Sequence, residues 1–265
     1  MKKRIDLLLV ERGLAPTRQR AQALIMSGNV LVADQPVTKP GQAVPEDSAV
    51  RIRGEEHPYV SRAALKLEAA LDRFQIAAAG RICLDIGAST GGFTQLLLLR
   101  GAERVHAIDV GHNQMDWAIR NDPRVRLLEK TNARNLAFDA VGAQVDVIVV
   151  DVSFISLEKV LPALIQFSRA GETDWVTLIK PQFEVGREKV GKGGIVSSDL
   201  DRQEVVDRIT RFAGTLGLER RGLIESPIAG MDGNRELLAW WRTCDTTPSE
   251  CPENEPGSRV RKNEL

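Results

Sequence analysis

Short apolar runs alternate with amphipathic stretches from residue 81 to residue 242. The run at 145–151 is almost entirely β-branched, which is typical of a strand buried on both faces of a sheet. This alternation predicts an open α/β sheet, mostly parallel, with one antiparallel strand. The strands are expected at Arg81–Ile86, Arg104–Asp109, Val125–Lys130, Val145–Asp151, Trp175–Lys180, Leu223–Ser226 and Leu237–Arg242. Helices are expected at 59–74, from Gly91 onward, at 157–169 with a bend or interruption near Pro162, and at 200–216.

Residues 3–55 follow a different pattern, with two short amphipathic helices ahead of short alternating strands. The first helix is expected at Arg4–Arg12, and Thr17 is expected to cap the second. A polar joint at 55–58 separates this pattern from the rest. We therefore expect a small α+β domain at residues 1–57 and a larger one at 58–243. Residues 244–265, rich in Pro, Glu, Thr and Asn, are expected to be a disordered tail.

The larger domain begins with a strand, a glycine turn and a helix start in the stretch ICLDIGASTGGFT, residues 82–94. Glycines let backbone N–H groups approach a ligand, and a helix N-terminus offers unpaired donors. The dinucleotide fingerprint G-x-G-x-x-G would need glycine at position 89, where this chain has Ser89. The pattern instead resembles the first motif of S-adenosylmethionine methyltransferases, although another nucleotide ligand stays possible at this point.

The expected Rossmann-like fold also places two polar side chains near this turn. An acid ending the second strand commonly grips ribose hydroxyls, and Asp109 has that position. Asn132 follows the third strand and is expected near an adenine ring. The expected cofactor-binding residues are Asp85, Gly87, Ala88, Ser89, Gly91, Gly92, Phe93, Asp109 and Asn132.

Composition narrows the function classes. The 265-residue chain has a net charge of zero, so any nucleic-acid footprint must be local. No apolar stretch reaches transmembrane length, and the N-terminus does not resemble a signal peptide. Three cysteines without zinc-site spacing, Cys83, Cys244 and Cys251, indicate no metal site and fit a reducing, cytoplasmic setting.

Local positive charge occurs in two places. Six basic residues against two acids give residues 1–30 a charge of +4. The whole pattern of residues 3–55 resembles the small RNA-binding domain first known from ribosomal protein S-four, which implies phosphate contacts through this face. The alternative is an ordinary solvated helix face. The candidate RNA-binding residues are Arg4, Arg18, Arg20 and Lys39, together with Arg187, Lys189 and Lys192 in a glycine-rich loop expected at 182–194 to be mobile.

Four further polar residues occupy positions at which sites form. Asp151 and Lys180 end buried strands, at the carboxyl edge of the expected sheet. Glu236 precedes the last strand, and Lys66 lies on the helix that enters the domain. Each alone is unremarkable, because a charge often ends a strand and a lysine beside an apolar stripe usually reaches for solvent. Two lysines and two acids meeting in one cleft would indicate chemistry.

Taken together, the stretches YVSRAALKL, LDIGASTGGFT, VDVIVVDVSFISL, LIKPQFEVG and GNRELL resemble the TlyA family. The resemblance implies an S-four-type RNA-binding domain joined to an FtsJ-like methyltransferase domain that uses S-adenosylmethionine. It implies ribosomal RNA in ribosomal subunits as partner, a ribose 2′-hydroxyl, with cytidine as the nucleoside, as acceptor, and Lys66, Asp151, Lys180 and Glu236 as the catalytic set. Lys180, if desolvated, could act as the base while Lys66 stabilises the oxyanion and the two acids orient the lysines, but the sequence does not decide which lysine takes the proton.

Three other functions stay open from sequence alone. A ribosome-binding assembly protein could keep the fold without catalysis, although the complete set of four polar residues argues against this. Some proteins of the family carry the label haemolysin, but the periodic helices here are needed to cover a sheet rather than to enter a membrane. A dehydrogenase is disfavoured by Ser89.

Overall fold

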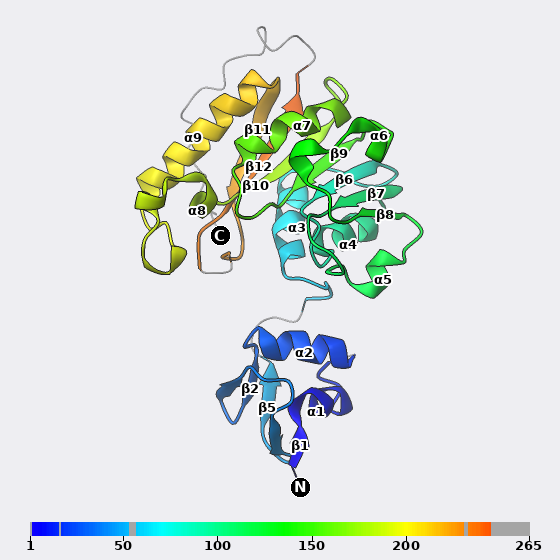
Figure 1. Cartoon of the computed structure of the whole chain (residues 1–265), viewed down its shortest axis with the longest axis vertical. Helices are drawn as coiled ribbons and strands as arrows, with labels where there is room; N and C mark the ends of the chain where they lie inside the picture. Colours follow the sequence, from blue (N-terminus) through cyan, green and yellow to red (C-terminus); the bar gives the residue numbers. More distant parts are fainter. Residues whose placement is uncertain (1, 16, 53–56, 231–232, 245–265) are drawn as a thin grey trace. The chain divides into compact units, whose positions relative to one another are not determined.

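The computed structural model describes residues 2–15, 17–52, 57–230 and 233–244. The chain divides into two compact units between Pro58 and Tyr59 (Figure 1). The tail expected at 244–265 lies outside the described residues except for Cys244.

The first unit packs two helices on short antiparallel strands. Thr17 caps the second helix as expected, and its hydroxyl accepts a hydrogen bond of 3.2 Å from Arg20 N. Ile5, Leu9 and Ile25 are fully buried in the core of the unit. The elements are β1 (Lys2–Arg4), α1 (Ile5–Glu11), α2 (Arg18–Met26), β2 (Val30–Val32), β3 (Gln35–Val37), β4 (Ala43–Pro45) and β5 (Val50–Ile52).

The second unit is built on one sheet with the order β11-β12-β10-β9-β6-β7-β8, seven strands within the described residues. Strand β12 runs antiparallel to both of its neighbours, and the other pairings are parallel. The fold class expected from sequence is therefore confirmed. The strands are β6 (Ile82–Ile86), β7 (Arg104–Ile108), β8 (Val125–Leu128), β9 (Val147–Val150), β10 (Asp174–Ile179), β11 (Leu218–Glu225) and β12 (Leu237–Thr243).

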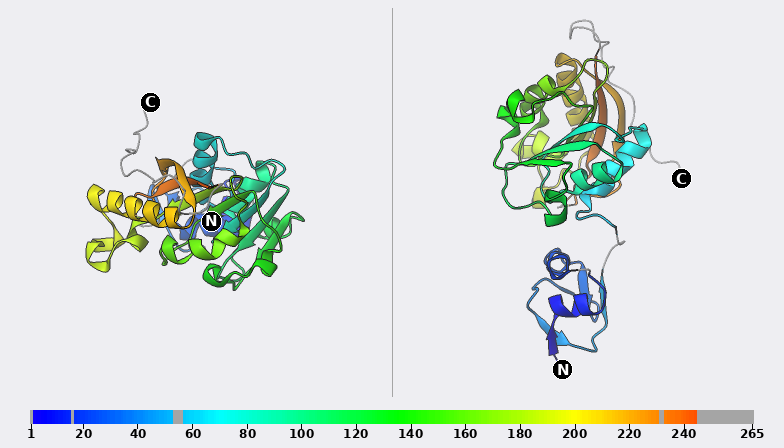
Figure 2. Two further views of the ribbon diagram at one scale, coloured as in Figure 1. Left: turned by 90° about the horizontal axis from the view of Figure 1, so that it is seen from above. Right: turned by 90° about the vertical axis from the view of Figure 1, so that its right-hand side faces the viewer.

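Helices cover both faces of this sheet (Figure 2). Because strand side chains alternate, β9 sends Val147 and Val149 to one face and Ile148 and Val150 to the other. The first face packs on α3 (Ala63–Phe74) and α4 (Gly92–Leu99), and the second on α7 (Leu161–Leu164) and α9 (Asp199–Thr215). The remaining helices are α5 (Trp117–Arg120), α6 (Phe138–Val141) and α8 (Pro181–Glu184), with short 3₁₀ turns η1 (Ala133–Asn135), η2 (Leu157–Lys159), η3 (Ile165–Phe167), η4 (Arg187–Lys189) and η5 (Lys192–Gly194).

Three expectations differ from the structure. The stretch 157–169 is η2, α7 and η3 rather than one helix, because Pro162 lacks the N–H that a continuous helix needs and sits in the first turn of α7. Helix α3 begins at Ala63 rather than near Tyr59. The loop at 182–194 holds α8 and the turns η4 and η5. None of the described helices is both long and apolar enough to cross a membrane.

Candidate active site

The glycine turn after β6 brings two strand ends into direct contact. Gly87 has a φ of +85°, and a Cβ there would collide with the carbonyl oxygen of Asp151, at the end of β9. Gly92 begins α4, where a Cβ would lie 3.0 Å from Ser61 Cβ, so glycine lets this helix approach the segment before α3. Glycine at both positions therefore places the end of β9 and the start of α3 against the turn.

Asp109 follows β7 and is tied to this turn by backbone hydrogen bonds. Its Oδ2 accepts from Ser89 N at 2.7 Å, and its Oδ1 accepts from Gly111 N at 2.6 Å. Ser89 adopts a left-handed φ of +47°, which turns its N–H toward the carboxylate. Asp109 and Asn132 both line a pocket of about 210 Å³ whose other walls include Ile108, Val152 and Ile155. A polar edge and apolar walls of this kind suit a nucleoside.

A second pocket, of about 150 Å³, lies over the turn itself and shares Gly87 and Ser153 with the first. Its lining includes the predicted residues Ala88, Ser89, Gly92 and Phe93. Together the two pockets hold every predicted cofactor residue except Asp85 and Gly91.

Asp85 and Gly91 support the turn from behind instead of lining it. Asp85 is fully buried in β6, where its Oδ2 accepts a 2.6 Å hydrogen bond from Thr94 Oγ1 on α4. Burial raises the pKa of Asp85 to about 7, with the negative charge of Asp151 adding to the rise. Gly91 has a φ of +93°, and a Cβ there would lie 3.3 Å from side-chain atoms of Met115 and Ile119, so glycine fits both the backbone and the space.

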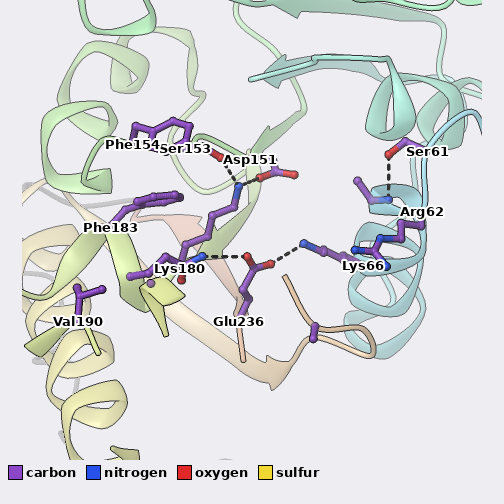
Figure 3. A pocket seen from close by; sticks show the side chains of 14 residues that line it. Ser61, Arg62, Lys66, Asp151, Ser153, Phe154, Lys180, Phe183, Val190 and Glu236 are labelled. Atoms are coloured by element: carbon purple, nitrogen blue, oxygen red, sulfur yellow. Dashed lines mark hydrogen bonds and ion pairs between the residues drawn. The ribbon is translucent and has the colours of Figure 1, made fainter. Parts of the chain in front are cut away.

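Lys66, Asp151, Lys180 and Glu236 line one larger pocket of about 450 Å³ (Figure 3). They form two ion pairs: Lys66 Nζ lies 2.5 Å from Glu236 Oε2, and Lys180 Nζ lies 2.5 Å from Asp151 Oδ1. Helix α3 supplies the first lysine, and the ends of β9 and β10 supply the second pair. Glu236 precedes β12 and is only 2% exposed. Four charges are thus held as two balanced pairs at the carboxyl edge of the sheet.

The four residues differ in which pocket they reach. Asp151 and Lys180 line both the 450 Å³ pocket and the pocket over the glycine turn, whereas Lys66 and Glu236 line only the larger one. Lys180 Nζ also donates a 2.8 Å hydrogen bond to Ser153 Oγ. The Lys180–Asp151 pair therefore stands at the boundary between the two pockets.

Sequence reasoning missed the aromatic residues of the larger pocket. Phe154 and Phe183 contact each other with ring centroids 4.9 Å apart, and both line the pocket. Phe154 is 89% exposed and has a left-handed φ of +63°. Its position four residues after the end of the central strand β9 was the one available signal, because residues there reach the carboxyl edge of the sheet.

The predicted RNA-binding residues are arranged in different ways. Arg4 and Arg18 both contact the buried carboxylate of Asp6, at 2.9 Å and 3.0 Å, and the hydrogen bonds from Arg4 lower the pKa of Asp6 far below its usual range. Their side chains remain about half exposed. Arg20 is partly buried, and Lys39 and Lys192 are exposed.

The remaining two predicted cations lie close together in sequence. Lys189 pairs with Asp201 at 2.9 Å and with Glu204 at 2.6 Å, so its charge is compensated within the protein. The side chain of Arg187 lies outside what the structure describes. Among the residues that it does describe, no cluster of His, Cys, Asp or Glu could hold a metal ion.

Comparison with known proteins places this geometry in a family. Residues 59–243 match the FtsJ-like methyltransferase family, and residues 3–50 match the S4 domain. The sequence is 49% identical to the 16S/23S rRNA (cytidine-2′-O)-methyltransferase TlyA of Mycobacterium tuberculosis over 91% of this chain and 90% of that protein. The chain belongs to the TlyA family.

Other TlyA relatives carry a different name. Hemolysin A of Brachyspira hyodysenteriae is 40% identical over 89% of this chain and 98% of its own length. A solved structure from Streptococcus thermophilus, also named as a hemolysin, superimposes with a TM-score of 0.73 at 40% identity and covers 96% of this chain and 94% of that chain. The family resemblance found in the sequence is therefore confirmed, and the two names occur on proteins of similar sequence.

Proposed function

We propose that this protein transfers a methyl group from S-adenosylmethionine to a ribose 2′-hydroxyl of ribosomal RNA, with cytidine as the modified nucleoside. The observation that carries the proposal is the boundary position of Lys180 and Asp151. They line both the pocket over the glycine turn and the pocket that contains Lys66 and Glu236. A methyl donor in the pocket over the glycine turn and an acceptor in the 450 Å³ pocket would meet at this ion pair.

The residues present fit S-adenosylmethionine. The nucleoside-sized pocket offers the Asp109 carboxylate for ribose hydroxyls, Asn132 for the base edge and apolar walls for the ring. The adjoining turn at 87–92 offers backbone N–H groups and a helix N-terminus for the carboxylate end of the cofactor. When bound, the cofactor supplies a methyl group that is already activated by a sulfonium centre.

The protein's own residues then have to manage one proton and one developing charge. A ribose hydroxyl is a weak nucleophile, so its proton must leave as its oxygen takes the methyl group. Lys180 would first release its own proton to solvent and then accept the hydroxyl proton, while Asp151 and Ser153 hold its Nζ in place. The Lys66 ammonium, fixed by Glu236, would stabilise the negative charge that develops on the oxygen.

The 450 Å³ pocket that contains Lys66 and Glu236, called the acceptor pocket from here on, also suits a nucleotide. Phe154 presents an exposed ring at the pocket, with Phe183 beside it. Sequence-specific RNA-binding proteins commonly stack splayed-out bases on such rings. The S4 domain would add affinity for RNA through phosphate contacts made by Arg4, Arg18 and Arg20. A ribosomal RNA substrate is consistent with a cytoplasmic location.

Mapping of ribose methylation tests the proposal. Ribosomal subunits lacking the modification would be incubated with purified protein and S-adenosylmethionine, and their RNA analysed by mass spectrometry after nuclease digestion. We expect a new 2′-O-methylcytidine. Methylation on a base, or ribosome binding without methylation by the intact protein, would contradict the proposal.

A further inference from the structure

Glu184 is a buried acid outside the candidate catalytic set. It ends α8, four residues after Lys180, and does not line the acceptor pocket. Its residue surface is 9% exposed, and this burial raises its pKa. A carboxylate taken out of water needs compensating donors, so its partners indicate why it is there.

The partners of Glu184 lie mainly in the segment that follows Asp151. Oε1 accepts a 2.8 Å hydrogen bond from Leu157 N, and Oε2 accepts a 2.7 Å bond from Ser156 Oγ. Arg208 on α9 donates to Oε2 at 3.3 Å and to the main-chain oxygen of Glu184 at 2.7 Å. Glu184 therefore ties α8 to the end of the segment that carries Ser153 and Phe154.

Two walls of the acceptor pocket are thereby joined at three points. The segment 151–157 after β9 contributes one wall through Asp151, Ser153 and Phe154. The segment 180–184 after β10 contributes the other through Lys180, Gln182 and Phe183. The Lys180–Asp151 and Lys180–Ser153 contacts join them at one end, the Phe154–Phe183 ring contact joins them in the middle, and Glu184 joins them at the other end.

The middle of the first wall contains a strained residue. Phe154 has a φ of +63°, a left-handed conformation that is unfavourable for an aromatic L-residue and persists only where neighbours hold it. The residue is 89% exposed, so apart from the contact with Phe183 its packing contributes little of that restraint. The bonds of the flanking residues must therefore supply much of it, and Ser156 and Leu157 are fixed by Glu184.

We propose that Glu184 is a positioning residue. It holds the 153–157 segment so that Phe154 faces the pocket, and through Phe154 it affects binding of the acceptor nucleotide. This inference rests on the proposed methyl transfer to RNA. It assigns Glu184 no contact with RNA or cofactor. Its loss should therefore weaken acceptor binding and leave cofactor binding unchanged.

The test uses Glu184→Gln, which keeps the side-chain volume but removes the charge that faces Arg208 and one of the two acceptor oxygens. Ser156→Ala removes a single donor and leaves the buried acid in place, so it carries the test if Glu184→Gln does not fold. Glu158→Gln is the matched control, because Glu158 pairs with the same arginine at 3.0 Å from the adjoining turn η2.

We expect Glu184→Gln to raise KM for ribosomal RNA about tenfold and Ser156→Ala about threefold, with the Kd for S-adenosylmethionine within about twofold of wild type. Glu158→Gln should stay within about twofold on both measures. In a Phe154→Ala background, Glu184→Gln should change KM by less than about twofold, because the residue through which it acts is absent.

The outcomes separate the two proposals. Wild-type protein that does not methylate RNA would contradict the proposed function itself. Active wild type with unchanged KM in both Glu184→Gln and Ser156→Ala would overturn the positioning role. So would an equal KM increase by Glu184→Gln with and without Phe154, because that result indicates a general structural effect.

Discussion

Lys66 and Glu236 stand 170 residues apart in the chain, yet their side chains form a buried ion pair with Nζ 2.5 Å from Oε2. Lys66 is 8% exposed and Glu236 is 2% exposed. The pair connects α3 to the residue that directly precedes β12, so it both lines the pocket and links two distant segments of the methyltransferase unit.

This burial gives a prediction about stability. Lys66→Met or Glu236→Gln alone leaves one buried charge without its partner and should lower the free energy of unfolding by about 3–5 kcal/mol. The double variant should lose much less than the sum. Urea unfolding of all four proteins measures the coupling. The exposed pair Arg100–Asp72, at 2.7 Å, is the control and should show coupling below about 1 kcal/mol. Additive losses at Lys66 and Glu236 would contradict the prediction.

Lys180 gives a prediction about turnover. Lys180→Ala should lower kcat by about a hundred- to ten-thousand-fold, as expected for loss of a general base. Lys180→Arg should not restore it, because guanidinium stays protonated at working pH. Single-turnover assays with labelled cofactor on ribosomal subunits measure both, with calorimetry to verify cofactor binding. Near-normal turnover in Lys180→Arg would exclude the base role and leave electrostatic stabilisation.

The cofactor pockets predict two graded effects on binding. Gly87→Arg should abolish S-adenosylmethionine binding, because even a Cβ at this position collides with the main chain of Asp151. Asp109→Ala should weaken binding through the loss of the ribose contact and of the bonds to Ser89 N and Gly111 N. Titration calorimetry measures both. Tighter binding of NAD than of S-adenosylmethionine by the wild type would refute the assignment.

The S4 domain predicts a change in salt dependence. Replacement of Arg18 and Arg20 by Ala should weaken RNA binding and flatten the plot of log affinity against log salt, by about one released counterion for each lost phosphate contact. Arg51→Ala in the same unit is the control, because Arg51 is exposed and pairs with Asp34 at 2.6 Å. Filter binding at several salt concentrations measures the slope. An unchanged slope in the double variant would support a merely solvated helix face.

Asp85 predicts how stability changes with pH. Its pKa is about 7 in the folded protein and near 4 in an unfolded chain, so the folded state binds the extra proton between these values. Asp85 therefore makes the protein less stable as pH rises through this window. Relative to wild type, Asp85→Asn should gain about 4 kcal/mol in unfolding free energy from pH 4 to pH 8. Urea unfolding across this range measures the difference, and a constant difference would contradict the raised pKa.

The hydrophobic pattern of the strands was enough to predict most of the fold of the second unit, because buried parallel strands leave a strong local signal in the sequence. Val147–Val150 is entirely β-branched, and each of Asp109, Asp151 and Lys180 immediately follows a strand. The short strand β1 was missed because its sequence, Lys-Lys-Arg, carries no apolar alternation and pairs with a distant segment, β4. Its pairing depends on tertiary contacts that a local pattern does not contain.

The residues of the candidate site also divide into those that local sequence could indicate and those that depend on tertiary contacts. Residues at strand ends could be named from sequence, since topology alone brings strand ends to one edge. Phe154 and Glu184 could not, because the exposure of the first and the buried contacts of the second depend on how two loops fold against each other. Asp85 was expected among the cofactor-binding residues, but it lies buried behind the turn, and sequence does not distinguish an acid that lines a turn from one that supports it.

The antiparallel strand β12 has a consequence for biosynthesis. Glu236 directly precedes it, and β12 lies between β10 and β11 in the sheet. A nascent chain that has not yet delivered residues 236–243 lacks the acidic partner of Lys66 and leaves β10 without the strand that pairs along its whole length. The pocket is thus completed by nearly the last residues that the structure describes, and methylation would begin only after translation has reached them.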